Sequence, residues 1–561
     1  MISHFRKKIN LAVVVPLFLL VFLFATDFVG EHMAGDAIHR DIAVHRYFSI
    51  PLVGFSLGLM VFVGVLKKGW RLPSALADFL SRKSLGIVIA SSAVFTIFFS
   101  AVLILRYTSF HTSVYELGGY DNKIWRISEE LSLGKSLIVA ATGHFQPILI
   151  LHGLLYKINN SPVVILIVQV LTVVSGVIPL YLLAKDILKE SVWTLMIILL
   201  YLLYPPVEFN SIADFHPDHF YIPLSLWAFY FAVRKNYLIS VLMIGLGALS
   251  KEPLLLGASF WGLYLIFNAK RYWLGSFSFI VFILIFFVVV LYIQPHLDPG
   301  LKKHNINILQ TESFSYMTDA VNYPNAIFSG IFKGLMRKLL FLFFILTPFL
   351  FLPLLGCKEF LPAIPLLAIP FLSSNPAHSN IESQYTAGII APVFVAFLVV
   401  LEKIKNKSGT RYAAAILSFV TVMVVTFHIA KSPSPFSINF WSQQWSDTWN
   451  YSNYISGEHE KAIRNVVCRI PDDRNKVVVT QSNINNKLLS HRFEYRGFPY
   501  EWEDADYILL DMKRPLMVAD RIDEKAYMDE LKKLRNNPGF QMDFMQDGVM
   551  VFKKIGKAKT T

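Results

Sequence analysis

Residues 213–220, with the sequence ADFHPDHF, bring two aspartates and two histidines together between long apolar runs. Asp214 and His216 are two positions apart, so in an extended segment their side chains lie on the same face. A carboxylate with an imidazole is a ligand set that suits zinc or manganese. Pro217 disfavours helical backbone at His216, and Asp218 stands where it could begin the next helix. The segment is a candidate site for a metal or an anion, or else a solvated loop in which His216 pairs with Asp214 and Asp218 caps a helix.

Other polar residues stand in four short stretches: YELGGYDNKIW (115–125), GHFQP (143–147), SKEP (250–253) and IESQYT (381–386). Acidic groups near lipid are costly and usually face a protein cavity or water. All five polar stretches fall at one face of the membrane if the apolar runs are spans, which predicts one shared site. A solvated position at the level of the lipid headgroups is the alternative for each. The candidate residues in these four stretches are Glu116, Tyr120, Asp121, His144, Pro147, Lys251, Glu252, Gln384 and Tyr385.

The composition indicates that lipid surrounds most of this chain. Of 561 residues, 54% are hydrophobic and 16% are charged, and the mean hydropathy is +0.49. These values exclude an ordinary soluble globular protein. We therefore expect an α-helical polytopic membrane protein. Apolar runs of bilayer length predict roughly thirteen transmembrane helices, near residues 10–29, 48–66, 84–105, 163–184, 191–206, 218–233, 236–250, 253–268, 272–293, 336–355, 359–373, 386–402 and 411–430.

Lysine and arginine residues predict the orientation of these helices, because basic residues in short loops stay on the cytoplasmic side. If Arg6, Lys7 and Lys8 are inside, strict alternation places the basic loops at 67–71 and 402–411 inside as well. The N-terminus is then expected inside and the C-terminus outside the cytoplasmic (inner) membrane. This topology signal and a basic tail account for the net charge of +13, so we expect no nucleic-acid partner.

Three domains are expected from the distribution of apolar and polar residues. Residues 1–80 would form an extra transmembrane hairpin, and residues 81–430 a polytopic membrane domain with a large first outer loop at 106–162. Polar residues return after residue 430, and residues 431–561 are expected to form a small extracytoplasmic α/β domain.

Short alternating segments predict the elements of this last domain. The pair FQMDFM and VMVFKK flanks Asp547-Gly548, and Asp-Gly favours a tight primed turn, so these two segments should form a hairpin. The other expected strands are KVVVT (476–480) and DYILLD (506–511), and the expected helices are NINNKLLSH (483–491) and RIDEKAYMDELKKLRN (521–536).

The order of these motifs resembles a known family. YELGGYDNKIW, GHFQPILILHGLLY, LYPPVEFNSIADFHPDHFYIPL, GALSKEPLLLG, QYTAGIIAPVF and VVVTQSNINNKLLSHRFEY with ADYILLD are similar to the predicted bacterial and archaeal membrane proteins called domain of unknown function 2079. The resemblance runs from about residue 84 to about residue 515 and leaves out residues 1–80. That family in turn resembles the C-type integral-membrane glycosyltransferases, which use polyprenyl-phosphate sugars as donors.

The resemblance to these glycosyltransferases implies particular residues. They keep an acid in a D-E-x-x-Y stretch just after a span, followed further along by a K-P-P-L element. Glu116 takes the position of the acid and Tyr120 that of the tyrosine, while His144 to Pro147 takes the place of the later element. Leu117 stands where the second acid would be, and Asp121 is a nearby carboxylate that could be the true counterpart.

The implied reaction moves a sugar from a polyprenyl-phosphate donor to an acceptor at the outer face of the membrane. Glu116 or Asp121 would take the proton of the acceptor. Positive charge or a metal would stabilise the departing phosphate, with Asp214 and His216 binding either a divalent metal or that phosphate. The sugar and the acceptor are not predicted. The implied donor- and acceptor-binding residues are Tyr120, His144, Pro147, Asp218, Lys251 with Glu252 as its partner, Gln384 and Tyr385.

Two further functions are compatible with the sequence. A transporter or lipid flippase would place substrate groups near the bilayer midplane between internal repeats, and we find no convincing repeat. A non-enzymatic membrane scaffold would bind a partner through its last domain, and the polar motifs would then have no role.

The basic loops lead to a prediction about topology. A reporter enzyme that works only outside the cytoplasm should be active when fused after residue 440 and inactive when fused near residue 407, because the loop at 402–411 is basic. The opposite pattern of reporter activity would place the five polar stretches on the cytoplasmic side.

Overall fold

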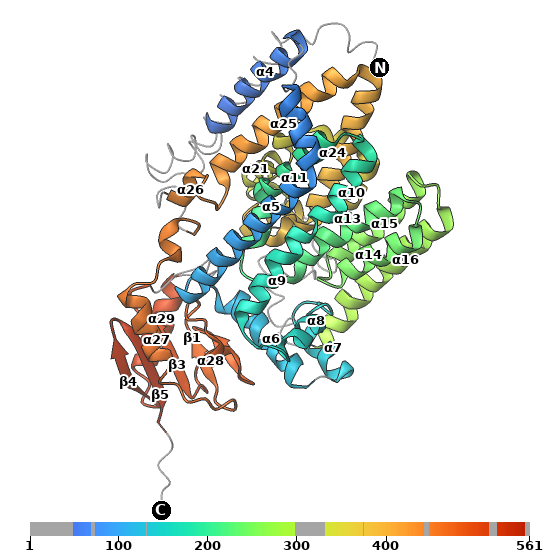
Figure 1. Ribbon diagram of the computed structural model, residues 1–561. Helices are drawn as coiled ribbons and strands as arrows, with labels where there is room; N and C mark the ends of the chain where they lie inside the picture. Colours follow the sequence, from blue (N-terminus) through green and yellow to red (C-terminus); the bar gives the residue numbers. More distant parts are fainter. Residues whose placement is uncertain are drawn as a thin grey trace, which may run out of the picture.

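Helices make up most of the protein, and a small sheet lies beside one end of them (Figure 1). The computed structural model describes residues 49–68, 73–130, 132–297, 331–373, 375–441, 448–514 and 524–555. The span expected near residues 10–29 and most of the loop expected at 294–335 lie outside these residues.

Six helices in the described part of the chain are long and apolar enough to cross a membrane, or seven if one bent pair is a single span. The bent pair is α11 (Ser191–Leu202) with α12 (Pro205–Ile212), which meet at 49° because two prolines begin α12. The expectation of several membrane helices is confirmed, whereas thirteen spans are not shown. The six are α4 (Ile50–Lys68), α5 (Ser74–Thr108), α9 (Pro162–Ser175) with α10 (Val177–Leu188), α16 (Tyr272–Val288) continuing through η4 (Val289–Ile293) and α17 (Gln294–Leu297), α24 (Ala387–Ser408) with the preceding η10 (Gln384–Thr386), and α25 (Thr410–Lys431).

Three expected spans are present as short helices: α13 (Tyr221–Val233), α14 (Tyr237–Ala248) and α15 (Leu254–Phe267). They have 13, 12 and 14 residues. At 1.5 Å per residue their lengths are about 18–21 Å, which is less than the roughly 30 Å of a bilayer core. They run back and forth between the same two ends, so their loops alternate between those ends.

The apolar stretch at residues 335–372 differs from the two uninterrupted spans expected at 336–355 and 359–373. It contains three short helices, α21 (Leu335–Leu346), α22 (Cys357–Phe360) and α23 (Ile364–Leu372), with two 3-10 turns between the first two and one between the last two. Each of these turns contains a proline, Pro348, Pro353 or Pro362. Proline removes a backbone donor and disrupts the preceding helical turn, so hydropathy alone overestimates helix length here.

The first large loop begins at the end of α5 and contains four short helices. Ser113 caps the first of them, because its side chain accepts a hydrogen bond from the amide of Tyr115. This loop carries the YELGGYDNKIW and GHFQP stretches. Its helices are η2 (Val114–Gly118), α6 (Gly119–Glu129), α7 (Leu133–Ala141) and α8 (Leu149–Tyr156).

The C-terminal sheet has five strands in the order β2-β1-β3-β5-β4, with β1, β2 and β3 parallel and β5 antiparallel to its neighbours. The hairpin is confirmed, and Asp547 and Gly548 both have positive φ, 51° and 83°, as a primed turn requires. Strand β2 and helix α27 were not predicted, and only four residues of the helix expected at 483–491 are helical. The strands are β1 (Val478–Thr480), β2 (Tyr495–Gly497), β3 (Tyr507–Asp511), β4 (Phe540–Gln546) and β5 (Val549–Lys554), and the helices are α27 (Glu458–Val467), α28 (Lys487–Ser490) and α29 (Glu524–Arg535).

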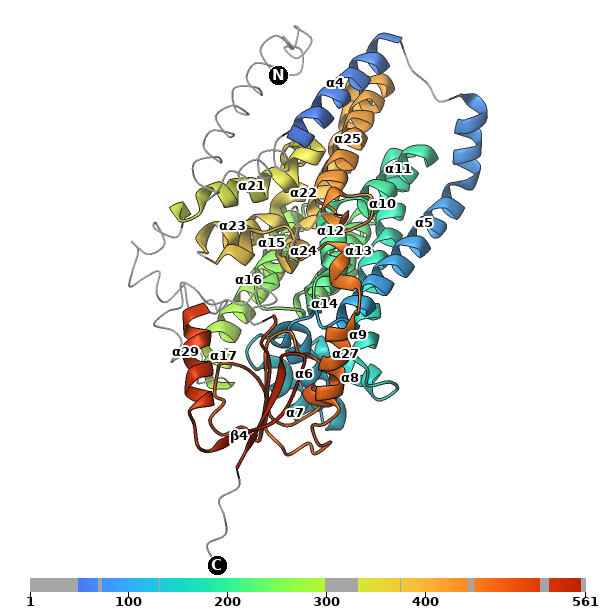
Figure 2. The ribbon, with the colours of Figure 1, turned by 90° about the vertical axis from the view of Figure 1, so that its left-hand side faces the viewer.

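The sheet packs directly against the first large loop, so that α6 lies beside it in both views (Figures 1 and 2). The amide of Val114 donates to the carbonyl of Ser482 at 2.7 Å, so the first residue of η2 is bound to the segment that follows β1. A methyl group added at Gly118 would lie 2.9 Å from Asn485 Oδ1, closer than real Cβ contacts allow. The contact between loop and sheet therefore depends on the absence of a side chain at Gly118.

Candidate functional site

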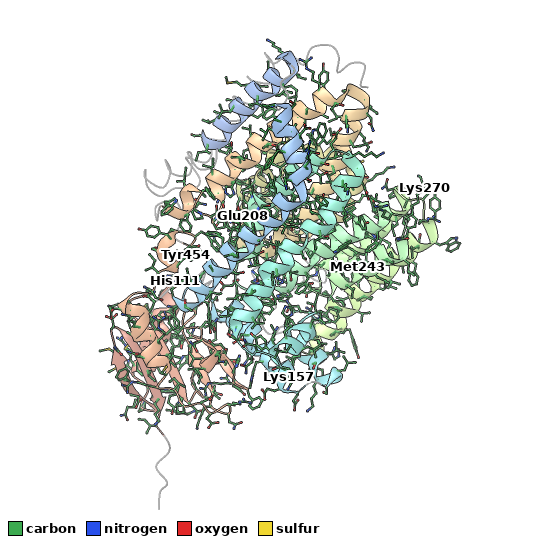
Figure 3. The ribbon with its side chains drawn as sticks, in the orientation of Figure 1. His111, Lys157, Glu208, Met243, Lys270 and Tyr454 are labelled. Carbon is green, nitrogen blue, oxygen red and sulfur yellow. The ribbon has the colours of Figure 1, made fainter. Side chains whose placement is uncertain are left out.

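A buried ion pair lies at the end of α5. The Arg106 guanidinium is 3.5 Å from Asp214 Oδ1, donates to the carbonyl of His111 at 2.8 Å, and stacks 4.6 Å from the Trp449 ring centre. Asp214 also accepts the amide of Ser113 at 2.5 Å. Burial raises the pKa of Asp214 to about 6 even though Arg106 acts in the opposite direction. His111 marks this junction of the helices and the sheet (Figure 3).

Glu116 and His216 face each other beside this pair. His216 Nδ1 lies 2.8 Å from the carbonyl oxygen of Asp214, which turns Nε2 toward Glu116 Oε1 at 4.0 Å. The Glu116 side chain is 41% exposed, whereas His216 is 9% exposed. The structure thus brings together two motifs 100 residues apart in sequence and leaves the Glu116 carboxylate open to solvent.

Tyr120 connects the Glu116 region with the GHFQP stretch. Its ring lies 5.3 Å from that of His216, edge to face, and its hydroxyl accepts a hydrogen bond from Gln146 Nε2 at 2.8 Å. Pro147 is half-buried in the turn that leads into α8. The ring of Tyr120 therefore forms a wall beside His216, and the GHFQP stretch holds its hydroxyl.

Glu252 is held by the same stretch. Its Oε1 lies 2.8 Å from His144 Nδ1, and its Oε2 accepts the amide of Phe145 at 3.0 Å. Burial raises the pKa of Glu252, but His144 and Lys251 outweigh burial and bring it below its ordinary value. Glu252 was expected to be the partner of Lys251, whose charge helps to lower its pKa, and its hydrogen bonds also hold the GHFQP stretch.

A cavity lies next to Asp218, at the end of the segment 214–218. It is lined by polar groups from four segments and by an apolar wall. Lys251 Nζ is 5.1 Å from the ring centre of Tyr385, and His378 packs edge to face against the same ring at 4.4 Å. Asp218 is buried, and its Oδ2 makes no hydrogen bond to the described residues. The lining residues are Asp218, Lys251, His378, Gln384 and Tyr385, with Pro253, Leu254, Leu366, Ile369, Pro370, Ala387 and Gly388 as the wall.

Sequence reasoning named four of these five polar residues and missed His378. His378 lies in the 3-10 turn η9 (Pro376–Ser379), and nothing in its local sequence distinguishes it from a solvated loop histidine. Arg106 was also missed, because an arginine at the end of an apolar helix resembles an ordinary topology signal. Only the fold shows that both are buried among the predicted site residues.

Asp121 lies in a different setting from Glu116, because its carboxylate is fully buried. Its Oδ1 accepts a hydrogen bond from the Tyr156 hydroxyl at 2.6 Å and lies 3.2 Å from His491 Nε2, while its Oδ2 accepts the Ser490 hydroxyl. Ser490 and His491 belong to the C-terminal domain. The carboxylate of Asp121 is therefore occupied in joining the first large loop to the sheet.

The surroundings of Asp214 and His216 do not suit a divalent metal. The guanidinium of Arg106 already faces the Asp214 carboxylate, so a metal ion would have to approach a positive charge. In the part of the chain that the structure describes, no three His, Cys, Asp or Glu side chains converge to hold a metal ion.

Comparison with known families identifies the chain. The family described as predicted membrane protein (DUF2079) matches residues 106–551. The chain belongs to this family. The match begins at Arg106, and it includes all the site residues described above. As a member of DUF2079, the chain is a membrane protein with several transmembrane helices.

Among solved structures, the chain is similar to the crystal structure of ArnT from Cupriavidus metallidurans bound to undecaprenyl phosphate. The TM-score is 0.43 and the sequence identity 10%, over 84% of this chain and 98% of that one. No curated protein matches the chain in sequence.

The hydrogen bonds of Asp121 lead to a prediction about the contact between loop and sheet. Asp121→Ala removes the acceptor of the Tyr156 and Ser490 hydroxyls, and hydrogen bonds to a charged group each contribute about 1.5–3 kcal/mol. Amide hydrogen exchange in residues 486–492 should therefore accelerate at least tenfold. Glu130→Ala is the matched control, since Glu130 pairs with Lys135 on the surface, where both side chains are more than half exposed. Equal exchange in the two variants would contradict the joining role of Asp121.

Proposed function

We propose that this DUF2079 protein transfers a sugar from a polyprenyl-phosphate-linked donor to an acceptor at the outer surface of the cytoplasmic membrane. One observation carries the proposal: the segment 214–218 borders two groups that the reaction needs. Its His216 faces the exposed carboxylate of Glu116, and its Asp218 lines a cavity together with Lys251. The sequence resemblance to C-type glycosyltransferases supports the same reading. Glycosyl transfer from a lipid phosphate requires both a base and a positive charge.

Glu116 is the base in this proposal. In a single displacement, the acceptor hydroxyl loses its proton to the Glu116 carboxylate while its oxygen bonds to the anomeric carbon of the sugar. The bond from that carbon to the phosphate oxygen breaks, and its electron pair leaves with the polyprenyl phosphate. The Glu116 side chain is 41% exposed, so an acceptor can reach its carboxylate, whereas the carboxylate of Asp121 is buried and accepts the Tyr156 and Ser490 hydroxyls.

The cavity beside Lys251 has a volume of about 40 Å³, so the donor would bind there only after the lining side chains move apart. The Lys251 ammonium would pair with the donor phosphate, and the amide of Gln384 could donate a hydrogen bond to the same group. The buried Oδ2 of Asp218 lacks a hydrogen bond to the described residues, so it can accept one from a sugar hydroxyl. The wall formed by Leu254, Leu366 and neighbouring residues would contact the first isoprene units.

Replacing each carboxylate with its amide distinguishes the role of Glu116 from that of Asp121. Glu116→Gln keeps the shape and removes the basicity, so the rate of polyprenyl phosphate release should fall on the order of 10²- to 10⁴-fold. Asp121→Asn should reduce the rate by much less, because it perturbs only the loop contact. The assay uses detergent-purified protein with a panel of short-chain polyprenyl-phosphate hexoses and pentoses, supplies a lipid extract of bacterial membranes as the source of acceptor hydroxyls, and measures release of the lipid phosphate.

The same assay tests the alternatives. Detergent solution has no second compartment, so turnover there distinguishes a transferase from a transporter or a scaffold. If the Glu116→Gln, Asp121→Asn double variant still turns over the donor, neither carboxylate is the base. No turnover of any panel member by the unaltered protein would count against the proposed reaction.

The proposed role of His216 is tested with a chelator. Because Arg106 already neutralises Asp214, EDTA should leave the rate of polyprenyl phosphate release unchanged. His216→Ala should lower kcat/KM for the donor by about tenfold or more, since the imidazole lies 4.0 Å from the Glu116 carboxylate and two residues before the cavity residue Asp218. Equal loss of activity with EDTA and with His216→Ala would restore the metal-binding role of Asp214 and His216.

A further inference from the structure

A second surface feature lies where two helix hairpins end. The loops between α13 and α14 and between α15 and α16 lie side by side and enclose an open groove of about 700 Å³. Lys235 and Lys270 occupy the tips with positive φ angles of 63° and 57°, and Figure 3 shows Lys270 at the outer end of its hairpin. The lining residues are Lys235, Asn236, Tyr237, Leu238, Ile239, Lys270, Arg271, Tyr272, Trp273 and Leu274.

This groove lies at the opposite end of the helices from the Glu116 site. Helix α13 begins one residue after Phe220, next to the cavity residue Asp218, and ends at Val233 beside the groove. Helix α14 returns from the groove and ends at Ala248, just before Lys251. The groove and the cavity are therefore separated by the length of one short helix, about 18–21 Å.

The groove carries positive charge without a balancing acid. Lys235, Lys270 and Arg271 are all exposed, and no carboxylate is among the lining residues. Within the described part of the chain, Lys235 and Lys270 form no ion pair. The guanidinium of Arg271 lies 4.7 Å from the ring centre of Tyr237, so it is oriented along the groove by an aromatic face. Three cations in one groove favour an anionic ligand.

Aromatic side chains beside these cations indicate that the ligand is a lipid. The Trp273 side chain is 93% exposed and Tyr272 is 60% exposed. Exposed tryptophan and tyrosine rings are typical of the membrane interface, where the ring contacts the glycerol region and the polar edge contacts water. A soluble phosphate would use the cations but would leave these rings in water.

Helices α14 and α15, whose ends border the groove, are shorter than a bilayer core is thick. A helix of 12 to 14 residues is about 10 Å shorter than a bilayer core, so at least one end of α14 and α15 lies below the usual surface of the core. Basic side chains in such a position extend toward the phosphate layer. Basic pockets between membrane helices are known to suit anionic headgroups.

We propose that this groove binds the headgroup of an anionic phospholipid of the bilayer. Lys235, Lys270 and Arg271 contact the phosphodiester, and Trp273 and Tyr272 contact the glycerol backbone and the start of the acyl chains. The site is separate from the glycosyl-transfer site, and the inference does not depend on that function.

The chain provides a control with equal charge at the same end. Asp186, Val233, Asn268 and Glu402 line one cavity, which places the ends of α10, α13, α15 and α24 together. Three exposed lysines on α10 and α24 can be neutralised without touching the groove, namely Lys185, Lys403 and Lys407. A general attraction of basic loops to anionic lipid would depend equally on these lysines.

The experiment compares two triple variants of the full chain, Lys235→Gln/Lys270→Gln/Arg271→Gln and Lys185→Gln/Lys403→Gln/Lys407→Gln. Each is purified in detergent and titrated with phosphatidylglycerol or phosphatidylcholine, and bound lipids are counted by native mass spectrometry. A basic residue near a headgroup contributes roughly fivefold in affinity. The groove variant should therefore bind phosphatidylglycerol at least tenfold more weakly, with the control and all phosphatidylcholine binding unchanged.

A second variant tests the aromatic contact. Tyr272→Ala/Trp273→Ala keeps every charge and should still weaken phosphatidylglycerol binding severalfold. Equal losses in the groove and control variants, or no loss in either, would overturn the proposal. Thermal stabilisation of the protein by inorganic phosphate equal to that by phosphatidylglycerol would also overturn it, because the ligand would then be a soluble anion.

Discussion

The buried pair of Arg106 and Asp214 determines where the other site residues lie. A guanidinium without solvent must have its donors occupied, and Arg106 uses the carbonyls of His111 and Ile212 together with the Asp214 carboxylate. These groups belong to the segment that follows α5, to the last residue of α12 and to the segment that follows α12. Asp214 in turn accepts a hydrogen bond from the backbone amide of Ser113, the residue after which η2 begins. Removing either charge of such a pair usually costs about 3–5 kcal/mol, because the other charge is left buried.

The same pair explains why two distant motifs form one site. Glu116 follows Ser113 by less than one helical turn, and His216 follows Asp214 by two residues, so fixing Ser113 against Asp214 fixes Glu116 against His216. The Glu116 side chain is 41% exposed. In contrast, Asp121 is only five residues away and is entirely enclosed.

Local patterns predicted much of the fold, and the particular failures have physical reasons. The Asp547-Gly548 hairpin was predictable because both residues tolerate positive φ. The number of spans was not predictable, since a hydropathy pattern does not reveal that the helix is interrupted at Pro348 and Pro353. Strand β2 has only three residues, of which two are half-buried, so it shows no alternation to detect.

The candidate site was predictable as a set of residues but not as an arrangement. Chemistry and motif order selected Glu116, Asp121 and Lys251 from the sequence. Nothing local separated Glu116 from Asp121, because the partners of Asp121 in the C-terminal domain are 369 and 370 positions further along the chain. Such partners are set by the packing of whole domains, and a single sequence without that packing leaves the two carboxylates equivalent.

This long separation has a consequence for how the protein is made. A ribosome that adds about 5–20 residues per second needs roughly 20 to 70 s to pass from Asp121 to Ser490. During that interval the first large loop has been synthesised, but Ser490 and His491, which complete the enclosure of Asp121, do not yet exist. The loop therefore reaches its final conformation only near the end of translation, after most of the apolar helices have entered the membrane. A nascent chain that stalls between residues 431 and 490 would contain the described apolar helices and would still lack the two side chains that complete the enclosure of Asp121.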